Sequence, residues 1–227
     1  MRFQYANLET CHTATGVVIV VDVLRAFSTA AYAFSRGAER IILVGDVDEA
    51  LSLKSRILNS KAMGEVRGLP PEGFDYGNSP TQIREQNFSG ITLIQRTGTG
   101  TQGAVRSKNA DVLLASSFVV AGATAKYVNS LAPTEVTFVI TGETFSGGDE
   151  DFACAEYLES QFKGQTVDTK PFIQRVYDSQ DAVEHLDPRQ PQFPVTDLEY
   201  CTDIDAFKFA MVVEKENNLL TMRKTKI

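Results

Sequence analysis

The feature that most constrains the fold is an unbroken apolar run near the N-terminus, GVVIVVDV at residues 16–23. β-Branched residues dominate it, and Asp22 is its first charged residue. Successive side chains of a strand point to opposite faces of the sheet, so a continuous apolar run predicts a strand that is buried on both faces. Such strands are typical of a parallel sheet covered by helices on its two sides.

Helical and strand patterns alternate along most of the chain. The alanine-rich segment 25–36 follows the apolar run and ends at Gly37, a common residue just past a helix end. We predict further strands at 41–44, 91–95, 111–115 and 136–140, and further helices at 47–58, 79–86, 104–109, 118–131 and 150–162. This alternation predicts an α/β fold with a mostly parallel sheet, helices on both faces and right-handed crossovers.

The C-terminal part has a different pattern. Residues 164–200 contain scattered acids and four prolines, which predicts irregular structure with one short helix near 179–185. Residues 207–213 and 219–224 alternate in polarity around EKENN, which predicts a C-terminal β-hairpin extension. We predict one α/β domain over residues 1–227, and a subdomain division at 165–227 is left open.

Composition excludes several classes of protein. The net charge of −7 argues against nucleic acid as a partner, because such binding relies on clustered Lys and Arg. No apolar run approaches the roughly 18 to 20 residues that span a bilayer, and no secretory signal is visible, so we expect a cytoplasmic location without a membrane partner. Three scattered cysteines and two histidines fit neither a disulfide framework nor a zinc site. A homodimer is left open.

A loop at residues 64–80, GEVRGLPPEGFDYGNSP, gathers polar side chains among four glycines and three prolines. Glycine and proline at this density exclude a helix or a central strand and predict a shaped loop, the kind of segment that often carries function. Its candidate site residues are Glu65, Asp75, Asn78 and Ser79. An ordered connection whose side chains bind their own backbone is the alternative, and we favour the functional interpretation.

Asp22 and Arg25 come at the end of the apolar run. A carboxylate at the end of a buried strand needs a metal, a cation or backbone donors. Arg25 offers a planar fork to a phosphate or a sulfonate, and Ser28 and Thr29 lie one turn further on. An ion pair between Asp22 and Arg25 explains the motif equally well.

Two further segments carry candidate residues. RTGTGTQG follows the strand at 91–95, and its glycine N–H groups, with Thr97, Thr99 and Thr101, can bind an anion or simply form a tight turn. GETFSGGDED places Glu143 in a glycine-rich loop and Asp149, Glu150 and Asp151 at a helix start. Acids there complement the helix dipole, and they can equally supply oxygen ligands to Mg²⁺.

In parallel sheets, ligands bind beyond the carboxyl ends of the strands, so we expect these segments to open onto one edge and to share a pocket. Oxygen ligands for Mg²⁺, an arginine and glycine turns together suggest phosphate chemistry. We predict Asp22, Glu65 and Asp75 as metal ligands or acid–base groups, with Glu150 and Asp151 as further metal ligands. The predicted substrate-binding residues are Arg25, Ser28, Thr29, Asn78, Ser79, Thr97, Thr99 and Thr101.

Four motifs in order, VVDVLRAFSTA, GE-x-x-G with PEGFDYGNSP, the Thr/Gly turn after RTG, and EDFACAEYL, resemble the 2-phosphosulfolactate phosphatase family over about two-thirds of the chain. The resemblance implies a Mg²⁺-dependent phosphatase that converts 2-phospho-3-sulfolactate to 3-sulfolactate, a step of coenzyme M biosynthesis. Two positions differ from the family pattern. Residues 96–101 read RTGTGT where relatives show a TTNGT-like turn, and residues 154–156 read CAE where relatives often have CAG.

Three functional hypotheses follow. The leading one is a phosphatase acting on a small phosphorylated hydroxy acid. The altered Thr/Gly turn motivates the second, a non-catalytic binder of anionic metabolites on the same fold. The third is a nucleotide-dependent oxidoreductase on a doubly wound sheet, which should bind NAD(P).

Overall fold

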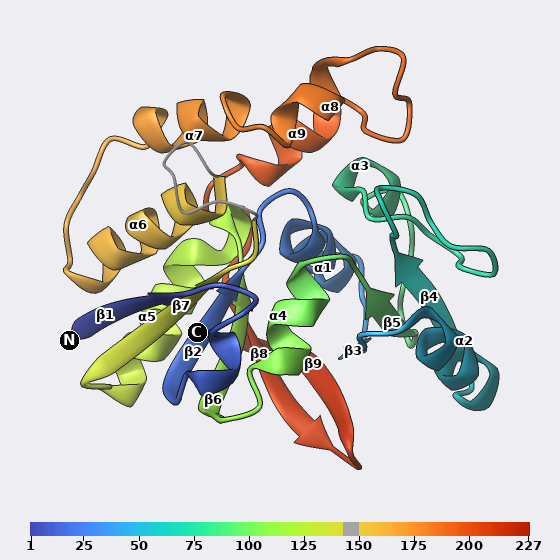
Figure 1. Ribbon diagram of the computed structural model, residues 1–227, viewed down its shortest axis with the longest axis horizontal. Helices are drawn as coiled ribbons and strands as arrows, with labels where there is room; N and C mark the ends of the chain where they lie inside the picture. Colours follow the sequence, from blue (N-terminus) through green and yellow to red (C-terminus); the bar gives the residue numbers. More distant parts are fainter. Residues whose placement is uncertain (143–149) are drawn as a thin grey trace.

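The computed structural model describes residues 1–142 and 150–227, and within these residues it forms one nine-stranded sheet with helices around it (Figure 1). The strands are β1 (Arg2–Ala6), β2 (Gly16–Val21), β3 (Arg40–Leu43), β4 (Ser60–Gly64), β5 (Thr92–Arg96), β6 (Ala110–Ser116), β7 (Glu135–Ile140), β8 (Phe209–Glu216) and β9 (Leu219–Lys226). The α-helices are α1 (Ala26–Ser35), α2 (Val47–Arg56), α3 (Pro80–Ile83), α4 (Gly100–Arg106), α5 (Ala121–Leu131), α6 (Glu150–Phe162), α7 (Lys170–Tyr177), α8 (Ala182–Leu186) and α9 (Thr196–Cys201). Short 3-10 helices, η1 (Cys11–Thr13) and η2 (Phe118–Val120), complete the described elements.

The β2 strand is buried on both faces, as its apolar run predicts. Val18 and Val20 contribute to a core with α1, while Val17, Ile19 and Val21 contribute to a second core with α5 and α6. Alternate side chains of one strand therefore serve two hydrophobic layers. The predicted α/β class, with helices on both faces of a mostly parallel sheet, is confirmed.

The sheet consists of two parallel blocks joined by the C-terminal hairpin. Its order is β1-β7-β2-β6-β8-β9-β3-β5-β4. Strands β1, β7, β2 and β6 are parallel, as are β3, β5 and β4. The β8–β9 pair lies between the two blocks and pairs antiparallel with β6 on one side and with β3 on the other. The hairpin predicted as an extension is present, and it occupies the middle of the sheet (Figure 1).

Three successive antiparallel pairings separate the blocks, so β3 runs opposite to β6 along the sheet. Sheets twist by roughly 20 to 25° per strand, and over many strands this turns the second block toward the first. Hydrogen bonds show that the carboxyl ends of β2 and β5 meet: Gln95 Nε2 donates to the Ala26 carbonyl, and Thr99 Oγ1 donates to Asp22. The sequence predicts that these strand ends meet at one edge of a parallel sheet. They do meet, but they come from two different parallel blocks.

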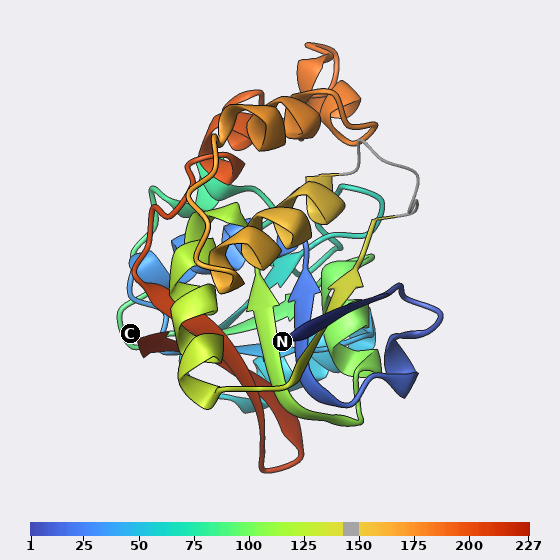
Figure 2. The same cartoon turned by 90° about the vertical axis from the view of Figure 1, so that its left-hand side faces the viewer.

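The segment after α6 differs from its prediction. Residues 164–200, predicted as irregular with one short helix, contain α7, α8 and α9. These helices lie together at one end of the molecule in both views (Figures 1 and 2). They are short and bury few residues each, which explains why their apolar periodicity is weak in the sequence.

Several element boundaries also differ. Strands β1 and β4 were not predicted, because both are short and lack a β-branched run. Helix α4 begins at Gly100, not at residue 104, since the two glycines that weaken the helical pattern lie inside the helix. No helix of the described residues is long and apolar enough to cross a membrane.

Candidate functional site

Asp22 directly follows β2, and its carboxylate connects three elements. Its Oδ1 accepts a hydrogen bond from the Ala26 N–H at the start of α1, at 2.7 Å. Its Oδ2 lies 3.1 Å from the Thr99 hydroxyl and 3.2 Å from the Thr141 hydroxyl. The side chain is 2% exposed, so β2, the turn after β5 and the end of β7 converge on one buried carboxylate.

Burial raises the pKa of Asp22 to about 6, since the charged form loses its hydration. The hydrogen bonds from Ala26, Thr99 and Thr141 oppose this shift, and the negative charge of Glu65 adds to it. A cation between the Asp22 and Glu65 carboxylates would stabilise the charged form of both.

Glu65 directly follows β4 and contacts the turn after β5, which also contacts Asp22. Its Oε1 accepts the Gly98 N–H, and its Oε2 accepts the Gly68 N–H at 2.8 Å. The turn fits closely against Asp22, because a Cβ atom at Gly100 would lie only 2.6 Å from Asp22 Oδ2. Asp22 and Glu65, which the sequence predicts to share a site, therefore meet at residues 98–100.

The Thr/Gly turn uses several of its own polar groups. The Thr97 N–H donates to Thr101 Oγ1 at 2.8 Å, and the Thr101 N–H donates to Thr97 Oγ1 at 3.0 Å. Of the glycine N–H groups predicted to bind an anion, that of Gly98 donates to Glu65 and that of Gly103 donates to the Thr99 carbonyl, so both are already paired inside the protein. Thr97 and Thr101 stabilise the turn, and Thr99 is the threonine of this set that lines a cavity.

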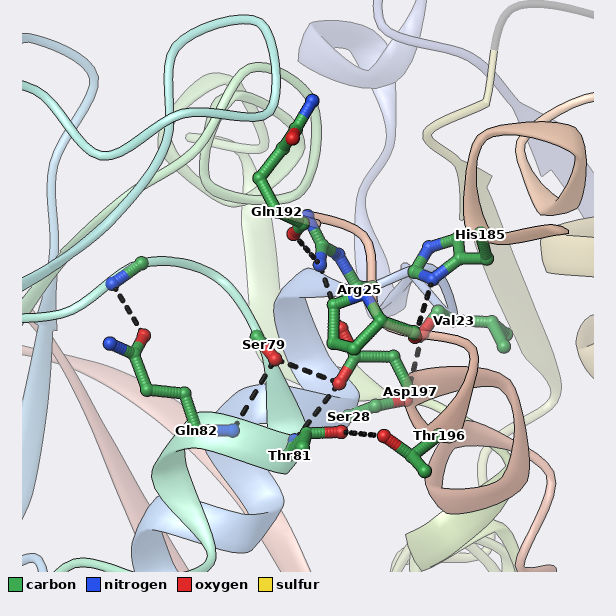
Figure 3. Close-up of polar contacts among 12 residues, drawn as sticks. Val23, Arg25, Ser28, Ser79, Thr81, Gln82, His185, Gln192, Thr196 and Asp197 are labelled. Atoms are coloured by element: carbon green, nitrogen blue, oxygen red, sulfur yellow. Dashed lines mark hydrogen bonds and ion pairs between the residues drawn. The ribbon is translucent and has the colours of Figure 1, made fainter. Parts of the chain in front are cut away.

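Arg25 lies in a buried network with the C-terminal helices (Figure 3). Its Nη1 donates to Asp197 Oδ2 at 2.7 Å and to the Gln192 carbonyl at 3.0 Å. Its guanidinium carbon lies 4.6 Å from the centre of the Phe193 ring. The alternative ion pair between Asp22 and Arg25 is wrong, because Arg25 pairs with Asp197.

Asp197, on α9, is a site residue that the sequence did not predict. Its side chain is fully buried, and its Oδ1 accepts hydrogen bonds from the Ser79 hydroxyl at 2.8 Å and the Thr81 N–H at 2.9 Å. Ser79 also caps α3 by accepting the Gln82 N–H, as its position before Pro80 predicts. Asp197 thereby ties α9 to α3 and to Arg25 (Figure 3), and its helix lies in the segment predicted as irregular.

Three other predicted substrate-binding residues occupy different environments. Asn78 lines the cavity described below and is 6% exposed; its Oδ1 has no hydrogen-bond partner within the described residues. Ser28 and Thr29 are completely buried in α1, and the Ser28 hydroxyl donates to the Val23 carbonyl at 2.8 Å. The structure brings Asn78 to the cavity and keeps Ser28 and Thr29 in the core.

The start of α6 lies against Asp22. Asp151 Oδ1 accepts the Val23 N–H at 2.7 Å, and its Oδ2 lies 3.0 Å from the Thr141 hydroxyl. Glu150 is also buried. Thr141 thus bridges Asp22 and Asp151, and its single hydroxyl hydrogen can serve only one of the two carboxylates at a time. Glu143 and Asp149 lie outside the described residues.

Asp75 is placed apart from the other predicted carboxylates. Its Oδ2 accepts the Ala62 N–H and contacts Lys54 Nζ, both at 2.8 Å, and Lys61 lies within 3.9 Å of its Oδ1. Burial alone would raise the pKa of Asp75, but the lysines and the Ala62 bond outweigh it and hold the pKa below its usual range. None of these partners lines the cavity that Glu65 lines.

A cavity of about 250 Å³ lies over the site. Of the predicted residues, it is lined by Arg25, Glu65, Asn78 and Thr99. The residues that were not predicted for it include Arg67, Asp181, Glu184, His185 and Phe193. A neighbouring cavity of about 320 Å³ shares Gly68 and Asn78 with it. The C-terminal helices thus supply one wall of a space whose other wall is the loop after β4.

Within residues 1–142 and 150–227, no three His, Cys, Asp or Glu side chains cluster as a ready-made metal centre. Mg²⁺ does not require one, since it keeps several waters and is often held by one or two carboxylates together with substrate phosphate oxygens. The cavity is lined by the acids Glu65, Asp181 and Glu184 and by the arginines Arg25 and Arg67. A bound cation would reduce the repulsion between these acids and an anionic ligand. Asp22 and Glu65 offer carboxylate oxygens, the type of ligand that Mg²⁺ prefers.

Fold and site define an α/β protein with an acidic centre where parallel strands end, closed on one side by short helices. The model of the 2-phosphosulpholactate phosphatase family matches residues 4–216. The chain belongs to this family, which confirms the resemblance seen in its motifs and the prediction of a phosphoric monoester hydrolase.

Several curated relatives carry the same name. The chain is 37% identical over 207 residues to a probable 2-phosphosulfolactate phosphatase of Bacillus subtilis (strain 168), covering 91% of this chain and 90% of the relative. It is 31% identical to a protein of that name from Thermotoga petrophila, covering 87% of each chain. A third, from Carboxydothermus hydrogenoformans, is 38% identical over 63% of this chain and 59% of its own length.

Proposed function

We propose that this protein is a Mg²⁺-dependent phosphatase that hydrolyses 2-phospho-3-sulfolactate, or a closely similar phosphorylated hydroxy acid, to the free hydroxy acid and phosphate. The observation that carries the proposal is the convergence of Asp22 and Glu65 on the turn at residues 98–100, beside a cavity. Family membership and the names of the relatives support the phosphoryl chemistry and the substrate.

The proposal assigns roles to residues of this chain. Asp22 and Glu65 would hold Mg²⁺, with Asp151 supporting Asp22 through Thr141. Bound Mg²⁺ supplies positive charge that offsets the negative charge developing on the phosphoryl oxygens. In hydrolysis a water oxygen bonds to phosphorus, the ester P–O bond breaks, and the alcohol oxygen gains a proton.

Arg25 and Asn78 are the proposed phosphate contacts. Arg25 lines the cavity, and its contacts with Asp197 and Gln192 use Nη1 alone, which leaves other N–H groups of its guanidinium for a ligand. The Phe193 ring and the C-terminal helices would limit the access of water to the reacting group. We also propose a cytoplasmic location and 3-sulfolactate as product, which is the link to coenzyme M biosynthesis.

Phosphate release from purified protein tests this function. The panel would hold 2-phospho-3-sulfolactate, 2-phospholactate and phosphoglycolate, each with Mg²⁺, with EDTA, and with EDTA followed by excess Mg²⁺. We expect release that is lost on chelation and restored by Mg²⁺. Saturable binding of these compounds without any release would instead support the alternative of a non-catalytic binder.

Matched variants test the assigned carboxylates. We expect Glu65→Gln to lower turnover by at least about 100-fold, as loss of a group that orients a metal ion commonly does. Glu72→Gln is the control, because Glu72 is exposed in the same loop and the substitution removes the same charge. Full Mg²⁺-dependent turnover by a folded Asp22→Asn protein would rule out the role given to Asp22.

A further inference from the structure

The cavity has in its lining one arginine that has no ionic partner among the described residues. Arg67 lines it and is exposed, and within the described part of the chain it forms no ion pair. The other arginine there, Arg25, is paired with Asp197. Among the described residues, Arg67 is therefore the arginine of the lining whose charge is not offset by an ion pair, and it can meet an incoming anion.

Arg67 is also held in a backbone conformation that its residue type disfavours. Val66 and Leu69 exchange backbone hydrogen bonds of 2.9 and 3.3 Å, and Arg67 and Gly68 between them have φ values of +52° and +81°. Positive φ at both central residues is the requirement of a type I′ turn, for which Asn-Gly, Asp-Gly and Gly-Gly are preferred. Non-glycine residues that their surroundings hold in this region are concentrated at functional sites.

The turn is fixed to the candidate site on two sides. The Gly68 N–H donates to Glu65 Oε2, while the other oxygen of the same carboxylate binds Gly98. On the far side, a Cβ atom at Gly68 would lie 2.2 Å from the Phe193 ring, the ring that also contacts the Arg25 guanidinium. Arg67 is therefore placed at a set position relative to both Glu65 and Arg25.

We propose that Arg67 is a specificity-determining residue that binds the second acidic group of the substrate, the carboxylate or sulfonate that accompanies the phosphate. The substrate class is then small phosphomonoesters with an additional acid group, and phosphomonoesters without one are discriminated against. This inference rests on the proposed function, since it assigns the phosphate to Arg25 and Asn78 on the cavity lining.

Substitution to Asn separates the charge of Arg67 from its backbone conformation. Arg67→Asn creates the Asn-Gly pair that a type I′ turn favours, so the loop should keep its shape while the cation is lost. Arg67→Gly is a second variant of the same kind, and Arg67→Lys keeps the charge. Arg56→Asn, at an exposed arginine in the last turn of α2, removes the same charge away from the cavity.

Calorimetric titration with 3-sulfolactate, which carries two acid groups and no phosphate, gives a readout that does not need turnover. We expect Arg67→Asn and Arg67→Gly to weaken its binding by at least about tenfold, the range of one lost charge-assisted contact, with a much smaller loss for Arg67→Lys. Binding of inorganic phosphate should change less than about threefold, and Arg56→Asn should change neither.

Equal affinity of wild type and both variants for 3-sulfolactate, an equal loss for 3-sulfolactate and phosphate, or no binding by wild type would each overturn the proposal. Phosphate release from 2-phospho-3-sulfolactate is measured in parallel. A protein that binds 3-sulfolactate through Arg67 but releases no phosphate would contradict the phosphatase function and retain the role of Arg67.

Discussion

The Asp197 carboxylate and the Arg25 guanidinium form a 2.7 Å ion pair in which both side chains are almost wholly buried. Removing one partner of such a pair leaves an unpaired charge in a low-dielectric environment, which costs about 3 to 5 kcal/mol. We expect Asp197→Ala to lower the free energy of unfolding by that order, measured by urea denaturation. Glu199→Ala, at an exposed acid of the same helix, should have little effect; similar losses in the two variants would contradict a special role for the pair.

Gly100 is predicted to be intolerant of any side chain. A Cβ atom there would lie 2.6 Å from Asp22 Oδ2 and 2.7 Å from the Ala26 Cβ, so the turn or the carboxylate must move. Because small misplacements of site groups commonly reduce rates by about 100-fold, we expect Gly100→Ala to lower turnover by at least tenfold. Gly45→Ala is the control, since its Cβ would meet its nearest neighbour at 3.5 Å. The measurement is the initial rate of phosphate release by each variant, and equal rates for Gly100→Ala and Gly45→Ala would contradict the prediction.

Asp75 gives a prediction about pH. Its pKa is lowered in the folded protein, so its ion pair with Lys54 stabilises the fold above the unfolded-state pKa and is lost as the pH falls through the folded pKa. We expect Asp75→Asn to lower stability at pH 7 by no more than about 1 kcal/mol, because the pair is partly exposed, and to lose this difference at acidic pH. Urea unfolding from pH 7 to pH 2 measures it.

The same variant separates two hypotheses about Asp75. The contacts with Lys54 and Ala62 lead us to expect that Asp75→Asn keeps Mg²⁺-dependent phosphate release. A loss of turnover comparable to that of Glu65→Gln would instead support the catalytic or metal-binding role predicted from the sequence.

His185 makes the C-terminal helices sensitive to acid. Burial lowers its pKa below 6.5, the positive charge of Arg25 adds to the lowering, and the Pro194 carbonyl and Asp197 oppose it. The neutral ring therefore contributes stability above the unfolded pKa, and this is lost as the pH falls through the folded value. We expect amides in α8 and α9 to be less protected from hydrogen exchange at pH 5 than at pH 7, after the exchange rates are corrected for the intrinsic effect of pH.

The chain's other histidine supplies the control for this effect. His12 is exposed, so His12→Gln should leave the pH dependence of exchange in α8 and α9 unchanged, while His185→Gln should flatten it. An unaltered pH dependence in His185→Gln would show that another group is responsible.

Local signals in the sequence predict much of the fold and part of the site. The apolar run of β2 places Asp22 at a strand end, and Ser79 before Pro80 predicts the start of α3. Asp197 has no such signal, because its partners Arg25, Ser79 and Thr81 are distant in sequence and its own helix is short. The position of Arg67 likewise depends on Glu65 and Phe193, which only the folded chain brings to Gly68.

The placement of β8 and β9 between the two parallel blocks has a consequence during protein synthesis. The ribosome makes the other described strands first, and no strand of the block β1-β7-β2-β6 pairs with a strand of the block β3-β5-β4, so the two blocks are joined into one sheet only through residues 209–226. The halves that carry Asp22 and Glu65 can therefore be joined into one sheet only after β8 and β9 have been made. Until then, the open edges of β6 and β3 are the places where chaperones or a neighbouring nascent chain can attach.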